Sequence, residues 1–285
     1  MIRQIAFGAL ALVFALASSV AAAQAQNGAL VARGKYLVDT VMTCHNCHTP
    51  RGPNGLAMDK ALSGGLRFDE PPFDVTASNI TSDKQTGIGA WSEADIKKFL
   101  TTGVRPNGVP VANVMPTGFY KVLTVRDLDA LAGYLHTVPP VNNTVPAPVY
   151  KIPLPATVVP DAQSPMSEAD LGDKVKRGFY LGTIAHCMEC HSPLGPKGRD
   201  FSRTGAGGFD FKGPWGVSTS RNITSSKAKG LGNWTDADIK RAITEGVSRD
   251  GSKLKPPMGY AFYAKMTPDD LDAIVAWLRT VPPVE

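Results

Sequence analysis

The chain has 285 residues and a formal net charge of +5, and 43% of its residues are hydrophobic. This length predicts about two domains. The sequence contains no basic run with interleaved aromatic residues, which excludes a nucleic-acid-binding protein. After residues 1–25, no segment approaches the ~20 apolar residues of a membrane span.

The N-terminus has the pattern of a secretory signal peptide. Arg3 gives a positive start, residues 5–20 form an apolar core, and an A-x-A cleavage site ends at Ala25. We therefore expect residues 1–25 to be removed and the mature protein to lie in the bacterial periplasm. The apolar core is slightly longer than usual, so an uncleaved N-terminal anchor and a peripheral position on the inner membrane stay open as alternatives.

Two C-x-x-C-H pentads use all four cysteines, and each follows a predicted helix. The first helix spans residues 29–41 and the second spans residues 173–185. In such a pentad the thiols add to the vinyl groups of haem as thioethers, and the adjacent His becomes the proximal iron ligand. We therefore expect two covalently bound haem c groups, attached at Cys44, Cys47, Cys187 and Cys190, with His48 and His191 as iron ligands.

Other uses of four cysteines fit less well. A zinc ribbon places its two C-x-x-C motifs about 15–20 residues apart, whereas these pentads begin 143 residues apart. A thioredoxin-like redox pair needs a βαβ setting, and no strand pattern flanks either pentad. A disulfide within each C-x-x-C would leave His48 and His191 without a role.

The sequence after the two pentads repeats at a spacing of 143 residues without a gap, and the sequence before them repeats at 144. This repeat indicates an internal duplication of a unit with one haem. The matched residues include Arg33 with Arg177, Tyr36 with Tyr180, Asn79 with Asn222, Trp91 with Trp234, Met115 with Met258, and Tyr120 with Tyr263.

The repeat also sets the expected domain boundaries. Domain 1 spans residues 26–140 and domain 2 spans residues 169–285. Between Pro139 and Pro165 the chain carries eight prolines, which predicts that residues 141–168 form a stiff, extended linker with little helix of its own.

Each copy contains two further predicted helices set in long loops, so the fold class is mainly α. The first of these helices lies between Ser92 and Gly103 in one copy and between Thr235 and Gly246 in the other. An N-cap residue followed by an acidic residue in the first turn marks its start, and a glycine marks its end. The last helix of each copy begins after Thr124 or Thr267. Its apolar residues recur at three and four positions and should face the core: Leu128, Leu131 and Leu135 in one copy, and Leu271, Ile274 and Leu278 in the other.

The sixth iron ligand decides the chemistry, and Met115 and Met258 are the candidates. They are the only methionines at matching repeat positions, and each lies 67 residues after its pentad His in a loop rich in glycine and proline. A single Met more often fills a gap in a core, but the matched placement favours thioether ligation. His136 is the chief rival in the first copy, although its repeat partner is Arg279 and not a second His.

Ligation by His and Met fills both axial positions of the iron and raises its reduction potential. Such an iron passes electrons and has no open site for a substrate. The sequence therefore predicts an electron carrier and not an enzyme. The propionates of two haem groups would bring the net charge close to neutral.

Further matched residues are candidates for the haem pockets. Aromatic rings with one polar group suit packing on a porphyrin, and the asparagines offer hydrogen bonds. Ordinary packing in loops and core is an equally good interpretation of these residues, which are Trp91, Trp234, Tyr120, Tyr263, Asn79 and Asn222.

The order of these motifs resembles that in the cytochrome c subunits of bacterial membrane-bound dehydrogenases for alcohol, gluconate, sorbitol and aldehyde. The quoted motifs are C-x-x-C-H, Asn-Ile-Thr, Gly-Ile-Gly-Ala-Trp or Gly-Leu-Gly-Asn-Trp, and Met-Pro or Met-Gly. The resemblance covers nearly the whole mature chain and implies two tandem cytochrome-c-like domains. It also implies His48 with Met115, and His191 with Met258, as axial ligand pairs. Better-known members carry three haem units and a membrane-binding tail, whereas this chain has two units.

The function expected from the resemblance is that of a periplasmic dihaem cytochrome c. It would accept electrons from the catalytic subunit of a dehydrogenase and pass them to a cytochrome, an oxidase or a quinone of the respiratory chain. The alternatives are a dihaem enzyme, such as a cytochrome c peroxidase or a thiosulfate dehydrogenase, and a freely diffusing carrier without a dedicated partner. A dihaem enzyme generally needs one haem with an open or unusual ligand, and the matched methionines argue against that asymmetry.

Overall fold

The computed structural model describes residues 24–53, 55–153, 157–196, 198–213 and 215–285. The predicted signal peptide lies almost entirely outside these ranges. Among the helices in the described ranges, none combines the length and the apolar character needed to cross a bilayer. Below, residues 24–140 are called the N-terminal half and residues 169–285 the C-terminal half.

The N-terminal half begins with a helix over residues 24–36 that continues as a π-helical turn into the first pentad. Helices dominate this half, and short hairpins lie between them. Its elements are η1 (Leu37–Val41), α2 (His45–His48), β1 (Arg51–Gly52), β2 (Gly55–Leu56), η2 (Met58–Lys60), β3 (Arg67–Glu70), β4 (Phe73–Thr76), α3 (Glu93–Thr102), η3 (Thr117–Val122) and α4 (Val125–Thr137).

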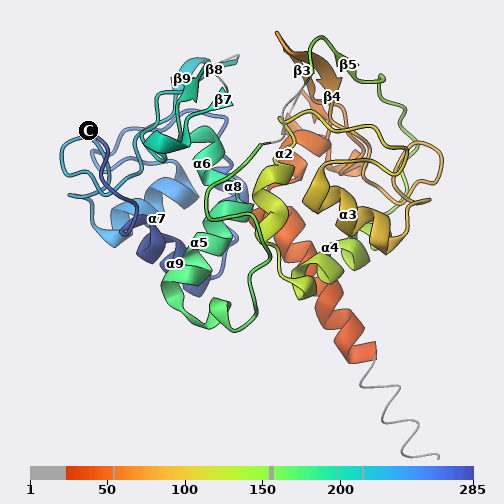
Figure 1. Ribbon diagram of the computed structural model, residues 1–285, viewed down its shortest axis with the longest axis horizontal. Coiled ribbons are helices and arrows are strands. Elements are labelled where there is room, and N and C mark those ends of the chain that lie inside the picture. Colours follow the sequence, from red (N-terminus) through yellow and green to blue (C-terminus); the bar gives the residue numbers. More distant parts are fainter. Residues whose placement is uncertain (1–23, 54, 154–156, 197, 214) are drawn as a thin grey trace, which may run out of the picture.

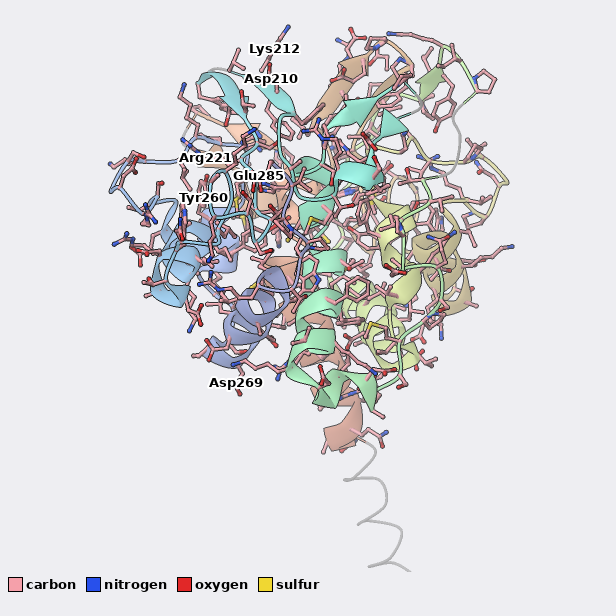
Figure 2. The ribbon with its side chains drawn as sticks, turned by 60° about the vertical axis from the view of Figure 1, so that its left-hand side comes forward. Asp210, Lys212, Arg221, Tyr260, Asp269 and Glu285 are labelled. Atoms are coloured by element: carbon pink, nitrogen blue, oxygen red, sulfur yellow. The ribbon has the colours of Figure 1, made fainter. Side chains whose placement is uncertain are left out.

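The C-terminal half passes through nearly the same order of elements, and the two halves form two lobes whose pentad helices lie on the sides that face each other (Figure 1). Figure 2 turns this half toward the viewer, with Asp210 and Lys212 on one hairpin and Asp269 at the start of the last helix. The elements are η4 (Asp170–Gly172), α5 (Lys174–Ile184), α6 (Cys187–Cys190), β6 (Leu194–Gly195), β7 (Gly198–Arg199), η5 (Phe201–Arg203), β8 (Asp210–Gly213), β9 (Gly216–Thr219), α7 (Asp236–Glu245), α8 (Tyr260–Tyr263) and α9 (Pro268–Leu278).

The helix boundaries follow from capping residues, as predicted. Ser92 and Asp95 form a capping box at the start of α3, in which each side chain bonds the backbone N–H of the other residue. Thr235 and Asp238 do the same at the start of α7. Both helices end at a glycine in the left-handed region, where a residue with a Cβ would be strained.

The final helices also begin and pack as predicted. The Thr124 side chain accepts the Asp127 N–H at the start of α4, and Thr267 accepts the Asp270 N–H at the start of α9. The inward faces carry the expected apolar residues, of which Leu131, Leu135, Ile274 and Leu278 are buried and Leu128 and Leu271 are partly buried.

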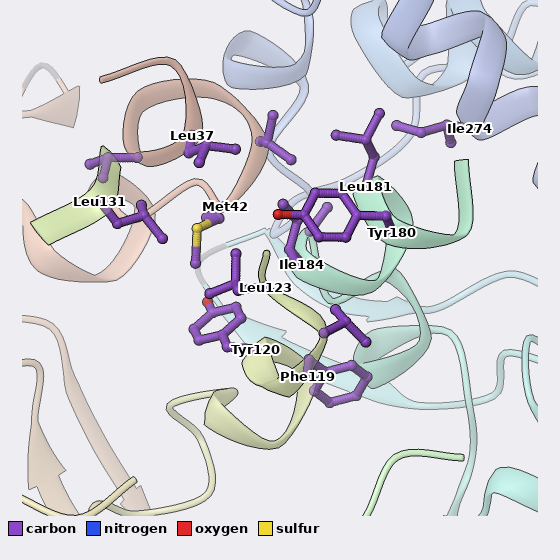
Figure 3. Close-up of a cluster of buried hydrophobic side chains, with 14 of the residues drawn as sticks. Leu37, Met42, Phe119, Tyr120, Leu123, Leu131, Tyr180, Leu181, Ile184 and Ile274 are labelled. Atoms are coloured by element: carbon purple, nitrogen blue, oxygen red, sulfur yellow. The ribbon is translucent and has the colours of Figure 1, made fainter. Parts of the chain in front are cut away.

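One hydrophobic core runs through both halves (Figure 3). Leu37 and Tyr120 of the N-terminal half belong to the same cluster as Tyr180, Ile184 and Ile274 of the C-terminal half. In Figure 3 the Tyr180 ring lies above Ile184, with its hydroxyl directed toward the side on which Leu37 and Met42 lie. The boundary between the halves is therefore a packed apolar interior.

The loops between the helices contain antiparallel hairpins, which the prediction of helices set in long loops does not include. Strand β3 pairs with β4, and β8 pairs with β9. The N-terminal hairpin has a small core of its own, made by Phe73, Val75 and Ala112. Strands of four residues or fewer are too short to show an alternating pattern that sequence reasoning could detect.

The described part of the segment 141–168 contains no helix. It also packs on the N-terminal half, which was not predicted. Strand β5 (Val149–Tyr150) adds to β4, Val159 is buried, and the Met166 N–H bonds the Val122 carbonyl at 2.9 Å.

Candidate haem-attachment sites

Each pentad forms one turn of helix directly after a residue with left-handed backbone. Thr43 has a φ of 49° and His186 a φ of 46°. In the first pentad the His48 N–H bonds the Cys44 carbonyl at 2.9 Å, and in the second the His191 N–H bonds the Cys187 carbonyl at 3.0 Å. Residues three and four apart share one face of a helical turn, so each turn presents two thiols and an imidazole to the same side.

The two pentad histidines have matching hydrogen bonds that leave one ring nitrogen for iron. His48 Nδ1 lies 2.7 Å from the Ser78 carbonyl oxygen, and His191 Nδ1 lies 2.7 Å from the Arg221 carbonyl oxygen. Because a carbonyl only accepts, Nδ1 carries the proton and Nε2 keeps its lone pair. Burial lowers the pKa of both imidazoles, so both rings are neutral near pH 7. This is the state that an axial ligand requires.

None of the four cysteines forms a disulfide. Burial raises the pKa of Cys44 to about 12, that of Cys47 to about 11 and that of Cys187 to about 12, and it also raises the pKa of Cys190. In the part of the chain that the structure describes, no three His, Cys, Asp or Glu side chains cluster as a metal site. The donor set fits haem c, with two thiols to bond the vinyl groups and one neutral imidazole beside them.

Asn79 and Asn222 fix the loops that supply the carbonyls to these histidines. Asn79, which follows Ser78, is 2% exposed. Its oxygen accepts the Thr81 N–H at 3.0 Å, and its amide donates to the Val141 carbonyl at 2.7 Å. Asn222, which follows Arg221, bonds the Thr224 N–H and the Val284 carbonyl in the same way. These amides bond the chain itself, so the asparagines position the pentad histidines.

Met115 and Met258 occupy equivalent bends, each directly before a short helix. The Met115 carbonyl accepts the Thr117 N–H at 2.8 Å, and the Met258 carbonyl accepts the Tyr260 N–H at 3.1 Å. Both side chains are partly buried against the hydrophobic cluster that Cys44 and Cys187 also border. Both methionines and both pentads therefore border one hydrophobic cluster.

His136, the rival ligand, bonds the backbone instead. Its Nε2 lies 3.0 Å from the Trp91 carbonyl oxygen. Its repeat partner, Arg279, donates to the Trp234 carbonyl at 2.6 Å. Two different side chains thus perform one structural task, and this disfavours His136 as an iron ligand.

The aromatic candidates belong to the same core as the pentads. Tyr120 is 2% and Tyr263 is 8% exposed, and burial raises the pKa of both phenols well above the usual value. Trp91 packs edge-on against Phe99 with ring centroids 5.4 Å apart. Trp234 is partly buried against the same cluster.

The first pentad also contacts the loop that carries Met258. His45 is 5% exposed and lies parallel to Phe262, with ring centroids 6.3 Å apart. Its ring nitrogens lie 2.8 Å from Thr49 Oγ1 and 3.0 Å from Asp39 Oδ1. The repeat partner of His45 is Met188, so nothing in the sequence marks a contact of this residue with the other half. The two candidate sites consequently adjoin across the boundary between the halves.

On the C-terminal side, the loops around His191 and Met258 reach one face of the molecule. Figure 2 shows Arg221 on the same face as Tyr260, which lies two residues after Met258. The backbone carbonyl of Arg221 accepts the hydrogen bond from His191 Nδ1. Burial raises the pKa of Tyr260, and the nearby Arg221 opposes this rise. This face borders the second candidate site.

Comparison with known proteins agrees with this geometry. Residues 175–282 match the cytochrome c family. The fructose dehydrogenase cytochrome subunit of Gluconobacter japonicus is 30% identical over 88% of this chain and 52% of its own length. The gluconate 2-dehydrogenase cytochrome c subunit of Pantoea cypripedii is 29% identical over 95% of this chain and 64% of its own length. A protein named diheme cytochrome c-type, from Cereibacter sphaeroides, is 29% identical over 85% of this chain and 83% of its own length.

Two consequences follow from these matches. The chain carries a cytochrome c domain and is similar to cytochrome c subunits of bacterial dehydrogenases, as the resemblance of its motifs predicted. It spans about half to two thirds of the dehydrogenase subunits that it matches.

Proposed function

We propose that this chain, which carries a cytochrome c domain, is a dihaem cytochrome c that relays electrons from a dehydrogenase to a respiratory acceptor. It would work in the periplasm as two duplicated domains, residues 26–140 and 169–285, each with one covalent haem. His48 and Met115 would bind one iron, and His191 and Met258 the other. The catalytic subunit of a dehydrogenase would be the donor, and a cytochrome, an oxidase or a quinone would be the acceptor.

The observation that carries the proposal is the equivalence of the two candidate sites. Each pentad presents two thiols and a neutral imidazole whose Nδ1 is held by a carbonyl, and each half places a Met in the same bend. The haem, when bound, supplies one-electron chemistry between Fe(II) and Fe(III). The pentad cysteines would hold it covalently, the Nδ1 hydrogen bonds would orient the imidazole ligands, and the apolar core with a Met ligand would favour Fe(II).

The test of ligation is a spectroelectrochemical titration of the matured wild-type protein beside Met115→Ala and Met258→Ala. In each variant, one haem is expected to lose its Met ligand and its low-spin state. The reduction potential of that haem should fall, and that of the other haem should not change. Met166→Ala, in the extended segment 141–168, is the control and should change neither haem. Unchanged spin state and potential in both ligand variants would refute the assignment.

The test of attachment uses the purified, matured protein. Its mass should equal that of the polypeptide plus two haem groups, and the pigment should stay with the polypeptide in acidified acetone. Extraction of the pigment would contradict covalent binding at the four cysteines.

The test of the partner is reconstitution of electron transfer. Reduction of this protein by a purified dehydrogenase encoded beside it should be fast and should saturate with protein concentration, as expected for a specific complex. Equal rates with unrelated dehydrogenases would favour a freely diffusing carrier.

A further inference from the structure

Two clusters of repeat-matched residues join the halves of the molecule. The first bridge consists of Arg33 and Asp127 of the N-terminal half with Tyr180 of the C-terminal half. The second bridge consists of Arg177 and Asp270 of the C-terminal half with Tyr36 of the N-terminal half. Each half therefore gives one tyrosine to the other half and receives one in return.

In the first bridge a buried carboxylate is shared between the halves. Asp127 is 2% exposed. Arg33 donates to it from Nε at 2.8 Å and from Nη2 at 2.7 Å. The Tyr180 hydroxyl donates to Asp127 Oδ2 at 2.6 Å, and Tyr180 is fully buried.

The second bridge repeats this arrangement. Asp270 is 2% exposed, and Arg177 donates to its Oδ1. The Tyr36 hydroxyl donates to Asp270 Oδ2 at 2.6 Å and accepts the Thr267 N–H at 3.2 Å. Because Thr267 is the N-cap of α9, a tyrosine of one half helps to cap a helix of the other.

Physical chemistry makes these hydrogen bonds specific. In each bridge the arginine and the carboxylate come from one half and form an ion pair. The carboxylate can still accept a hydrogen bond from the tyrosine hydroxyl of the other half. A buried carboxylate left without a partner is costly, so these bonds favour one orientation of the halves over others. Residues matched at 143 and 144 positions make the interface two-fold in character, with the same patch contributed by both sides.

The bridging tyrosines lie on the helices that lead into the pentads. Tyr36 directly precedes η1, which continues into the first pentad, and Tyr180 lies in α5, which leads into the second. The first pentad in turn contacts α8, the helix that follows Met258, through His45 and Phe262. A shift at either bridge would therefore move one candidate site relative to the other.

We propose that Tyr36 and Tyr180, with their carboxylate partners Asp270 and Asp127, are positioning residues that set the geometry for electron transfer between the two haem groups. This inference rests on the proposed function, because it requires two haems. The tyrosines act through the helices that carry the pentads.

The test uses the full-length, matured protein with Tyr36→Phe, Tyr180→Phe and the double substitution. Tyr→Phe keeps the ring and removes only the bridging hydroxyl. Tyr134→Phe is the matched control, because the Tyr134 hydroxyl bonds Asp39 within the N-terminal half. Asp270→Asn, alone and with Tyr36→Phe, completes a double-mutant cycle for the second bridge.

Two measurements are made on each variant. Amide hydrogen exchange at the first turns of α4 and α9 reports on the bridges and does not depend on haem reduction. The rate of electron transfer between the haems, after rapid reduction by one electron, reports on their relative geometry. The visible spectrum and the haem content of each variant show whether the individual sites are intact.

The bridging variants should exchange about tenfold faster at these helix starts for each hydroxyl removed, and transfer between the haems should slow relative to Tyr134→Phe. In the cycle, Tyr36→Phe should have a smaller effect in the Asp270→Asn background than in the wild type, because the hydroxyl has already lost its carboxylate partner. Unchanged exchange, or faster exchange with an unchanged inter-haem rate, would overturn the proposal. A protein without two haems would refute the proposed function instead, and haem content alone reveals that failure.

Discussion

Asn79 and Asn222 show how a single side chain, distant from the cysteine thiols, can set the orientation of a pentad histidine. Asn79 holds the loop whose Ser78 carbonyl orients His48. The Asn-Ile-Thr repeat was visible in the sequence, but the partner of its amide was not, because Val141 lies 62 residues further along the chain.

Asn79→Ala should lower the free energy of unfolding, because it leaves buried groups without partners at about 1–3 kcal/mol each. It should also broaden the bands in the spectrum of the first haem, because the Ser78 carbonyl, which orients His48, is no longer held in one position. Urea denaturation and the haem spectrum measure the two effects. Asn142→Ala, at an exposed neighbouring position, is the control, and equal destabilisation by both changes would contradict this role.

His136→Arg should be tolerated, because Arg279 makes the equivalent bond to the Trp234 carbonyl. The spin state of the first haem should stay as in the wild type, and the free energy of unfolding should change by less than about 1 kcal/mol. A change of axial ligation in the visible and EPR spectra would restore His136 as a ligand.

At the level of helices, close crossings depend on two repeat-matched glycines. A Cβ on Gly34 would lie 1.9 Å from the Ala130 carbonyl oxygen of α4, and a Cβ on Gly178 would lie 1.9 Å from the Ala273 carbonyl oxygen of α9. Each helix that leads into a pentad is thereby pressed against the last helix of its own half.

Gly34→Ala and Gly178→Ala should each destabilise the protein by about 1–3 kcal/mol or more, because the backbone of the facing helix must move. Gly133→Ala is the control, since a Cβ there meets no atom within 4 Å, and it should stabilise α4 by about 0.5–1 kcal/mol. Thermal unfolding of the three variants checks the difference in sign.

Sequence reasoning predicted the helices well and the rest of the backbone less well. Local signals such as Ser92 with Asp95, or the glycine after α3, fix a helix within a few residues, and the structure confirms them. The hairpins and the packing of Val149 on β4 depend on contacts between distant segments, which no local pattern encodes. For the same reason Tyr36 and Asp270 looked unrelated in the sequence, although one bonds the other.

For the molecule as a whole, the boundary between the halves should respond to alkaline pH. The pKa of Tyr36 is raised from its usual value of 10 to about 12. Burial is the larger cause, and the hydrogen bond to Asp270 is the second. A raised pKa means that the folded protein favours the protonated phenol. The stability that this group contributes is complete below pH 10 and is lost as the pH rises toward 12.

The loss of stability between pH 10 and 12 should therefore be smaller in Tyr36→Phe than in the wild type. Urea midpoints of the wild type and Tyr36→Phe across this range give the comparison. Parallel pH curves for wild type and Tyr36→Phe would show that the Tyr36 phenol does not contribute.

The segment 141–168 has a kinetic consequence. It ties the two halves into one chain and is itself fastened to the first of them, through β5 and the Met166 N–H. Because the segment joins the halves covalently, their effective concentration does not depend on the protein concentration, and dilution does not part them. Separation and re-association of the halves are consequently unimolecular steps, and their half-times do not depend on the protein concentration.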